Sequence, residues 1–183
     1  MSEAALSSIT ESMLTFHCPR YAELPLIPLY RDQVLDGLNY YIQPLCTDSS
    51  QPLVTAAMIN NYVKMKLLAP PVKKRYDRDQ MAQLLCILLL KQVFSIGEIR
   101  RLLEIQTRTY PFPEAYDYFC TEFETALQVT FSTRKFSGIG QQSRPTPLSE
   151  LVCSAALCVA QKIFTQKFLL LDEQAPLQPE DAY

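Results

Sequence analysis

The chain has 183 residues and a mass of 20.9 kDa, which suits one domain, or one domain plus an appendage. Hydrophobic residues make up 48% and charged residues 20%, a balance that excludes disorder of the whole chain. The net charge of −2 excludes a globally basic nucleic-acid binder, and 4 glycines with 1 histidine argue against glycine-rich phosphate sites and histidine-based catalysis.

The basic residues are concentrated in one segment. Residues 60–80 contain six basic and two acidic residues, although the chain as a whole is acidic. Because salt screens distant charges, such a local patch can still hold a polyanion. The six basic residues are Lys64, Lys66, Lys73, Lys74, Arg75 and Arg78.

The cysteines and the hydropathy pattern predict a cytoplasmic protein. The six cysteines lack Cys-x-x-Cys spacing and mostly fall in apolar helical patterns, which favours free thiols in a core over a zinc site or disulfides. No basic segment typical of a signal peptide begins the chain. The most apolar run, residues 81–90, is shorter than the roughly 20 residues of a membrane span. We expect no metal, no cofactor and no membrane association.

The first half of the chain predicts helices and no strand of any length. Residues 1–29 are expected to form an arm that packs on the body. Residues 30–44 have the apolar spacing of a helix with one buried face. After a polar loop at 47–52, Thr55 is a good N-cap for a helix that ends before the prolines at 70–71.

The second half contains the most apolar helix. Asp77 and Gln80 can cap a helix over residues 78–93 that is apolar nearly all round, as expected for the centre of a small bundle. Ser95 and Glu98 form a capping box for the next helix. The remaining predicted segments are a helix at 114–129, a loop or hinge at 131–144, and a last helix from Pro147 to about Leu170 with Thr146 as its N-cap.

One stretch, residues 55–103, carries a functional pattern. The exposed face of helix 55–66 offers amide and ammonium groups, and asparagine can pair with adenine while lysine contacts guanine or phosphate. The connector 72–76 places further cations beside that helix, where they would grip phosphates. This layout is that of a helix-turn-helix with a small wing. The predicted DNA-binding residues are Thr55, Asn60, Asn61, Tyr62, Lys64, Lys66, Lys73, Lys74, Arg75 and Arg78.

Several strings in residues 54–103 follow one another in a characteristic order: Tyr62, Leu67-Leu68, Pro70-Pro71, Arg75-Tyr76, the leucine-rich run 84–88, and Phe94-Ser95-Ile96-Gly97-Glu98-Ile99. In this order they resemble the DNA-binding head of MerR-type regulators. The resemblance implies a winged helix-turn-helix that binds duplex DNA. Lys66 replaces the glycine that usually precedes Leu-Leu in that family, so the same turn would require Lys66 to adopt an unusual backbone conformation.

A closer resemblance extends toward the N-terminus. It rests on the strings Tyr30-Arg31-Asp32-Gln33-Val34, Met58-Ile59-Asn60-Asn61-Tyr62-Val63-Lys64 and Pro70-Pro71-Val72-Lys73-Lys74-Arg75-Tyr76. These are similar to a bacterial domain-of-unknown-function family (number 1836), described only as MerR-like. The expected organisation is an N-terminal arm at 1–29, a MerR-like helix-turn-helix head at 30–106, a helical region for dimerisation or an effector at 107–172, and a flexible acidic tail at 173–183.

We therefore expect an all-α transcription regulator that binds double-stranded DNA, with no catalytic residues. Small residues along the last helix, such as Ala156 and Ala160, suit either a homodimer interface or packing within the chain's own bundle. Tyr62 could be core or contact phosphate, and Tyr76 is expected in the core. The alternative is a protein-interaction module that keeps the fold without reading bases, because arginines common in the MerR recognition helix are replaced by Ala57 and Asn60.

Overall fold

The computed structural model describes residues 3–46, 52–133 and 147–174. These residues form seven α-helices, two short 3₁₀ turns and one two-stranded sheet. The helices are α1 (Glu3–Leu14), α2 (Arg31–Ile42), α3 (Ala56–Lys64), α4 (Arg78–Leu90), α5 (Ile96–Thr109), α6 (Phe112–Thr133) and α7 (Pro147–Gln174). The 3₁₀ turns are η1 (Tyr21–Glu23) and η2 (Gln43–Leu45), and the strands are β1 (Leu29–Tyr30) and β2 (Arg75–Tyr76).

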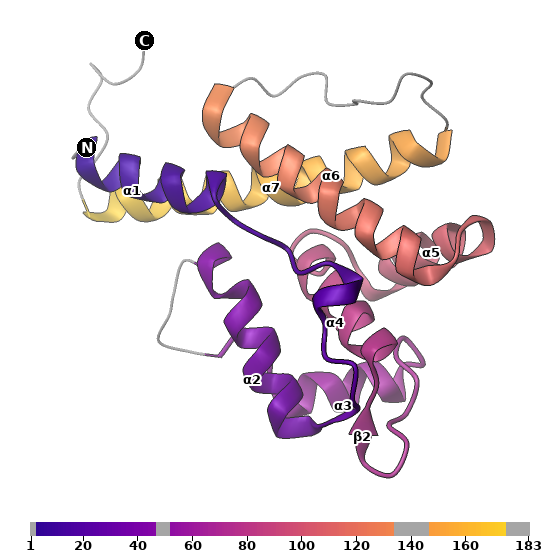
Figure 1. The fold of residues 1–183 in the computed structure, drawn as a ribbon. Helices are drawn as coiled ribbons and strands as arrows, with labels where there is room; N and C mark the ends of the chain where they lie inside the picture. Colours follow the sequence, from indigo (N-terminus) through magenta and orange to yellow (C-terminus); the bar gives the residue numbers. More distant parts are fainter. Residues whose placement is uncertain (1–2, 47–51, 134–146, 175–183) are drawn as a thin grey trace.

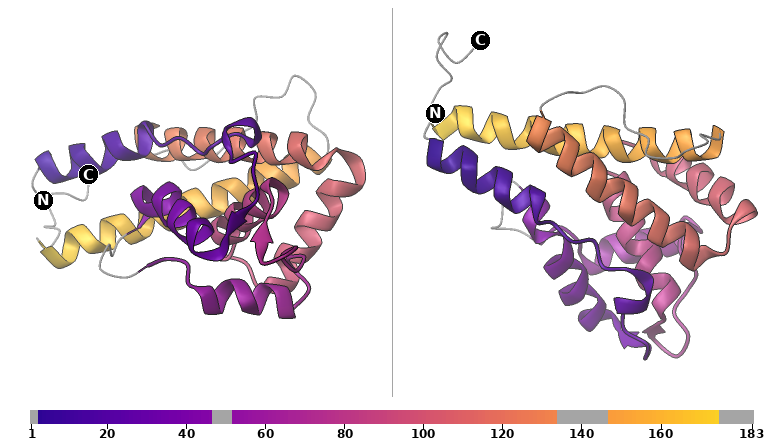
Figure 2. Two further views of the ribbon diagram at one scale, coloured as in Figure 1. Left: turned by 60° about the horizontal axis from the view of Figure 1, so that its bottom comes forward. Right: turned by 45° about the horizontal axis from the view of Figure 1, so that its top comes forward.

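The helices lie on two sides of α4 (Figure 1). On one side α1, α6 and α7 run next to one another, and on the other lie α2, α3 and the small sheet. The two further views agree that α1 lies along the C-terminal helices although it is distant from them in sequence (Figure 2). Helix α1 of the N-terminal arm therefore belongs to the same layer as α6 and α7.

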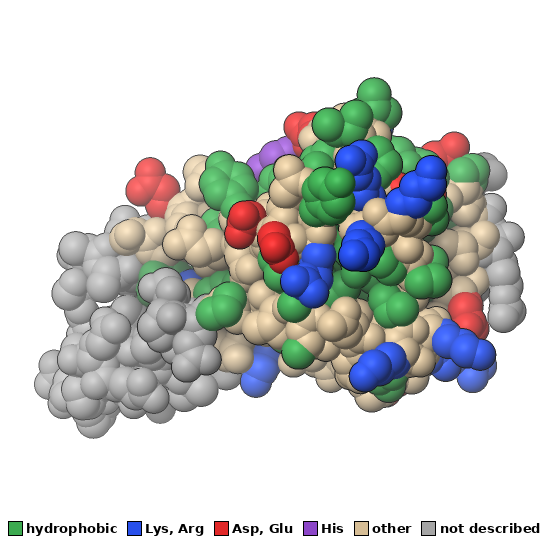
Figure 3. Space-filling view, turned by 90° about the horizontal axis from the view of Figure 1, so that it is seen from below, with side chains coloured by type: hydrophobic (Ala, Val, Ile, Leu, Met, Phe, Trp, Pro, Cys, Tyr) green, Lys and Arg blue, Asp and Glu red, His purple; other side chains and the backbone are tan. Residues whose placement is uncertain are grey.

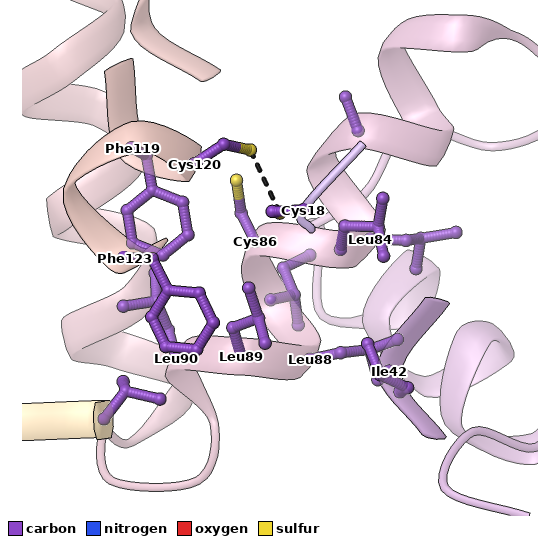
Figure 4. Close-up of a cluster of buried hydrophobic side chains, with 14 of the residues drawn as sticks. Cys18, Ile42, Leu84, Cys86, Leu88, Leu89, Leu90, Phe119, Cys120 and Phe123 are labelled. Atoms are coloured by element: carbon purple, nitrogen blue, oxygen red, sulfur yellow. Dashed lines mark hydrogen bonds between the residues drawn. The ribbon is translucent and has the colours of Figure 1, made fainter. Parts of the chain in front are cut away.

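Helix α4 forms the centre of the core, as its all-round apolar sequence predicts. Every residue from Gln80 to Leu90 except Gln83 is buried. Figure 4 shows Phe119, Cys120 and Phe123 of α6 on one side of α4 and Ile42 of α2 on the other. Because both layers pack on the same helix, the described residues share one hydrophobic core.

The cysteines are free thiols, and four of them are buried, which confirms their expected place in the core. The Sγ atoms of Cys18 and Cys120 lie 3.1 Å apart (Figure 4). The hydrogen bond with Cys120 and burial raise the pKa of Cys18, so it is held as a neutral thiol. This contact joins the segment after α1 to α6.

The structure confirms the all-α class and adds one small sheet. Leu29 pairs with Tyr76 and Tyr30 with Arg75 in an antiparallel sheet that the sequence pattern did not reveal. The reason is physical, since strands of two residues are too short to show alternation. No helix in the described part of the chain is long and apolar enough to span a membrane.

Several helix boundaries also differ from the expected ones. Helix α6 starts at Phe112 and continues to Thr133, so the start of the expected loop at 131–144 is helical. Helix α7 extends to Gln174, beyond the predicted end near Leu170. The rest of that loop, the Thr146 cap and the tail from residue 175 lie outside the described residues.

Candidate nucleic-acid interface

Helix α3 separates a buried face from an exposed polar face. The Thr55 hydroxyl caps the helix by accepting a hydrogen bond from the N–H of Met58 at 3.4 Å. Ile59 and Tyr62 are buried and fix the helix on the core. Asn60, Asn61 and Lys64 are exposed on the opposite side, which confirms the predicted split of the helix into two faces.

The two tyrosines of the pattern belong to the core. Tyr62 and Tyr76 are each only 4% exposed. Burial raises the pKa of both side chains, so their hydroxyls stay neutral. The expectation for Tyr76 is confirmed. Tyr62 supports α3 from within and is not part of the exposed surface.

The end of α3 is a hydrogen-bonded turn that requires a left-handed residue. The N–H of Lys66 donates to the carbonyl of Val63 at 3.0 Å, and the N–H of Leu67 donates to that of Tyr62 at 2.9 Å. Lys66 has a φ of 56°, the conformation in which glycine is preferred. The unusual backbone expected from the missing glycine is therefore present, and the lysine side chain is exposed beside α3.

The connector after the prolines is a tight hairpin with two lysines at its tip. Val72 and Arg75 exchange backbone hydrogen bonds of 3.0 and 2.9 Å. Lys73 and Lys74 between them have φ values of 50° and 65°, as in a type I′ turn, where Asn-Gly is the usual sequence. Both side chains are exposed. The hairpin therefore presents two neighbouring ammonium groups.

The two arginines of the segment are held by residues that precede α2 in the chain. Arg75 lies over the ring of Tyr30 at 4.6 Å and donates a hydrogen bond of 3.0 Å to its hydroxyl. Arg78 lies over the ring of Tyr21 at 5.3 Å, and its Nε donates to the carbonyl of Pro25 at 3.5 Å. Their charge contributes to the face, but their side chains are less free than those of the lysines. Sequence reasoning missed these aromatic partners, because nothing local connects them to the basic segment.

Residues 19–119 match the family described as "Domain of unknown function (DUF1836)". The chain belongs to this family. No curated protein and no solved structure matches the chain. The DUF1836 match includes α2 to α5 and both strands. The candidate face, which consists of the exposed side of α3 and the hairpin at 72–75, therefore lies within it.

This face of the DUF1836 protein combines cationic, amide and apolar side chains. Seen from below, lysine and arginine side chains spread over its middle and right, with hydrophobic side chains between them (Figure 3). Within the described residues, none of the six basic side chains of 60–80 forms an ion pair with a carboxylate. Their charge is therefore available to an anionic partner. Sequence reasoning also missed the exposed apolar residues Leu26 and Ile27 before β1 and Val72 in the hairpin.

Proposed function

We propose that this protein binds duplex DNA in the cytoplasm as a regulator of transcription, with a MerR-like winged helix-turn-helix. Helices α2 and α3 are the helix pair, and the hairpin at residues 72–75 is the wing. Helix α3 enters the major groove, where Asn60 and Asn61 face base edges and Lys64 contacts phosphate or guanine. The exposed amides of α3 support this assignment, because within the described residues neither side chain has a hydrogen-bond partner.

The observation that carries the proposal is the pair Lys73 and Lys74 at the hairpin tip. Both lysines have a left-handed conformation that costs on the order of 1 kcal/mol or more for each residue with a Cβ. Asn-Gly would form the same turn with less strain. Two exposed, unpaired ammonium groups on a strained turn contribute nothing evident to folding, whereas they suit contact with successive phosphates.

The test is fluorescence-anisotropy binding of the full chain to a pool of random duplex DNA at about 50 and 200 mM salt. We expect binding at low salt that weakens steeply, with a log–log slope of roughly −0.9 for each phosphate neutralised. The same titration at high protein concentration gives the stoichiometry. A homodimeric regulator predicts two chains on each site of a selected duplex.

Two matched double variants distinguish a local contact of the hairpin with DNA from an effect of the protein's net charge on DNA affinity. Lys73→Glu together with Lys74→Glu should reduce affinity at least about tenfold, because two phosphate contacts become repulsive. The control is Arg101→Glu together with Lys162→Glu, which makes the same charge change at exposed positions on α5 and α7. Equal losses in both double variants would mean that only net charge matters and would contradict the placement of the wing.

Exposed apolar residues favour a second candidate function, a protein-interaction module. Leu26 is 79% exposed and Ile27 is 73% exposed in the segment just before β1, which pairs with β2 at the end of the hairpin. Val72, at the start of the hairpin, is also 73% exposed. Clustered exposed apolar side chains mark protein-binding surfaces. Absence of DNA binding even at low salt would favour this alternative over the DNA-binding proposal.

The alanines of α7 that could have suited a dimer interface pack within their own chain. Ala155, Ala156 and Ala160 are buried, and α7 packs mainly on α6 of the same chain. The DNA stoichiometry is the test of the proposed homodimer.

A further inference from the structure

A polar cavity lies where the end of α3 meets α4, α5 and the start of α6. Its volume is about 320 Å³, at the lower end of the range of roughly 300–1,000 Å³ for small-molecule sites. The charged residues that line it are Lys66, Arg100, Asp79 and Glu104. The site is separate from the exposed face of α3 and from the hairpin.

The charges around the cavity balance. Lys66 and Arg100 are basic, whereas Asp79 and Glu104 are acidic. Asp79 accepts a hydrogen bond from the hydroxyl of Tyr21 through one carboxylate oxygen. Within the described residues, Lys66 and Glu104 form no ion pair. A simple anion would meet two carboxylates and a simple cation would meet two cations, so a ligand with both charges is the complementary one.

The guanidinium of Arg100 has one N–H group without a hydrogen-bond partner. Its Nη2 donates to the backbone carbonyl of Met65, the C-cap of α3. Its Nε is buried and has no hydrogen-bond partner. A buried charged donor without a partner is costly, and a carboxylate accepts two parallel N–H bonds from a guanidinium. A ligand carboxylate would therefore give Arg100 a better partner after a small shift of its side chain.

The rest of the wall is largely apolar. Leu67, Leu103 and Phe112 line the cavity next to the charged groups, and the amide of Gln83 is occupied by the carbonyl of Leu67 at 2.8 Å. We propose that this cavity binds a free α-amino acid with an apolar side chain. Its carboxylate meets Arg100 and Lys66, its ammonium meets Glu104 and Asp79, and its side chain lies on the apolar wall.

Ligand binding here would act on the end of α3. Arg100 and Gln83 hold the carbonyls of Met65 and Leu67, which flank the left-handed Lys66. A ligand carboxylate that binds Arg100 would weaken its hydrogen bond to the carbonyl of Met65. The end of α3 would then be attached to α5 less firmly with the ligand than without it. This regulatory consequence rests on the proposed DNA binding, whereas the binding of the amino acid does not.

The test is isothermal titration calorimetry of the full chain, without DNA, so that its failure and the failure of DNA binding are distinguishable. The probes are L-leucine, L-isoleucine, L-valine, L-methionine and L-phenylalanine. Three analogues of leucine each lack one feature: 3-methylbutylamine lacks the carboxylate, 4-methylpentanoate lacks the ammonium, and glycine lacks the side chain. We expect at least one of the five to bind with a Kd below about 1 mM, and each matched analogue to bind at least about tenfold more weakly.

The variant Glu104→Gln removes one charge from an exposed side chain. It should weaken binding of the amino acid about five- to tenfold and leave that of 4-methylpentanoate unchanged. The control Glu11→Gln makes the same change at an exposed position of α1 and should have no effect. No saturable heat with any of the five amino acids up to about 10 mM would overturn the proposal. So would analogues that bind as tightly as the amino acid, or a Glu104→Gln variant with unchanged affinity.

Discussion

Three lysines have backbone conformations that residues with a Cβ rarely adopt. Lys66 ends α3, and Lys73 and Lys74 form the tip of the hairpin, all with φ between 50° and 65°. At Lys66 the surroundings impose the conformation, because Tyr62 and Leu67 on either side of the turn are both buried. The strain at Lys66 is thus a local cost that the packing of the turn offsets.

This strain predicts a stabilising substitution. Lys66→Gly should raise the free energy of unfolding by about 1 kcal/mol, because glycine adopts the left-handed conformation without a steric penalty. The measurement is the urea midpoint at constant slope. Lys64→Gly is the control, since residue 64 lies within the helix, and it should lower the free energy of unfolding by up to about 1 kcal/mol. Equal destabilisation by both variants would contradict the left-handed turn.

At the scale of the elements, local caps define where the helices of the core begin. The Asp77 carboxylate accepts from the N–H of Gln80 at 2.9 Å, and the Gln80 amide oxygen accepts from the N–H of Asp77 at 3.0 Å. In α5, Glu98 accepts from the N–H and the hydroxyl of Ser95 at 2.8 and 2.7 Å. Both capping boxes predicted from the sequence are therefore formed.

The box of α5 predicts a pH dependence. Hydrogen bonds from the Ser95 hydroxyl and then its backbone N–H hold the pKa of Glu98 below its ordinary value of 4.5. The folded state thus favours the carboxylate, so its stabilising effect is present above pH 4.5 and is lost as pH falls through the lowered pKa. Glu98→Gln should be destabilised relative to the native chain at neutral pH, and the difference should shrink in acid.

Urea midpoints of both proteins at about pH 7, 5 and 3.5 provide the measurement. Repeating it in a Ser95→Ala background gives the control. There the effect of Glu98→Gln should be smaller, because one donor to the carboxylate is gone. A difference that stays constant or grows toward low pH would show that the box does not stabilise the folded carboxylate.

At the scale of the whole molecule, α4 makes the two layers interdependent. The arm that carries α1 is tied to α6 by Glu124, which accepts from the N–H of Cys18 at 2.7 Å and from Arg20 Nη1 at 2.9 Å. The ring of Phe16 meets that of Phe123 edge-on at 5.9 Å. On the other side of α4, α2 carries α3 and the sheet. The two sides should therefore unfold together.

Two core substitutions, one in each layer, test this cooperativity. Met13→Ala in α1 should cost about 2–5 kcal/mol and Ile59→Val in α3 about 0.5–1.5 kcal/mol, since both side chains are fully buried. Far-UV circular dichroism and tyrosine fluorescence should report the same single transition in each variant. Ser12→Ala, at an exposed position of α1, is the control and should leave the midpoint unchanged. Two separate transitions would contradict a shared core.

Much of the helical framework could be predicted from local signals. The start of α2, the Thr55 and Ser95 caps and the stop before Pro70 depend on neighbouring residues, and the structure places each as expected. The polar face of α3 could also be predicted from helical spacing. Ile59 and the residue three positions later lie on the buried side, whereas Asn60 and Asn61 between them lie on the exposed side.

The remaining features depend on contacts between distant parts of the chain. The pairing of Leu29 with Tyr76 and the stacking of Arg75 on Tyr30 have no sequence pattern of their own. Local spacing predicts helices and their exposed faces because caps and periodicity act within a few residues. Which cations are anchored, and which residues surround the cavity at Arg100, is decided by packing, because those neighbours meet only when the chain has folded.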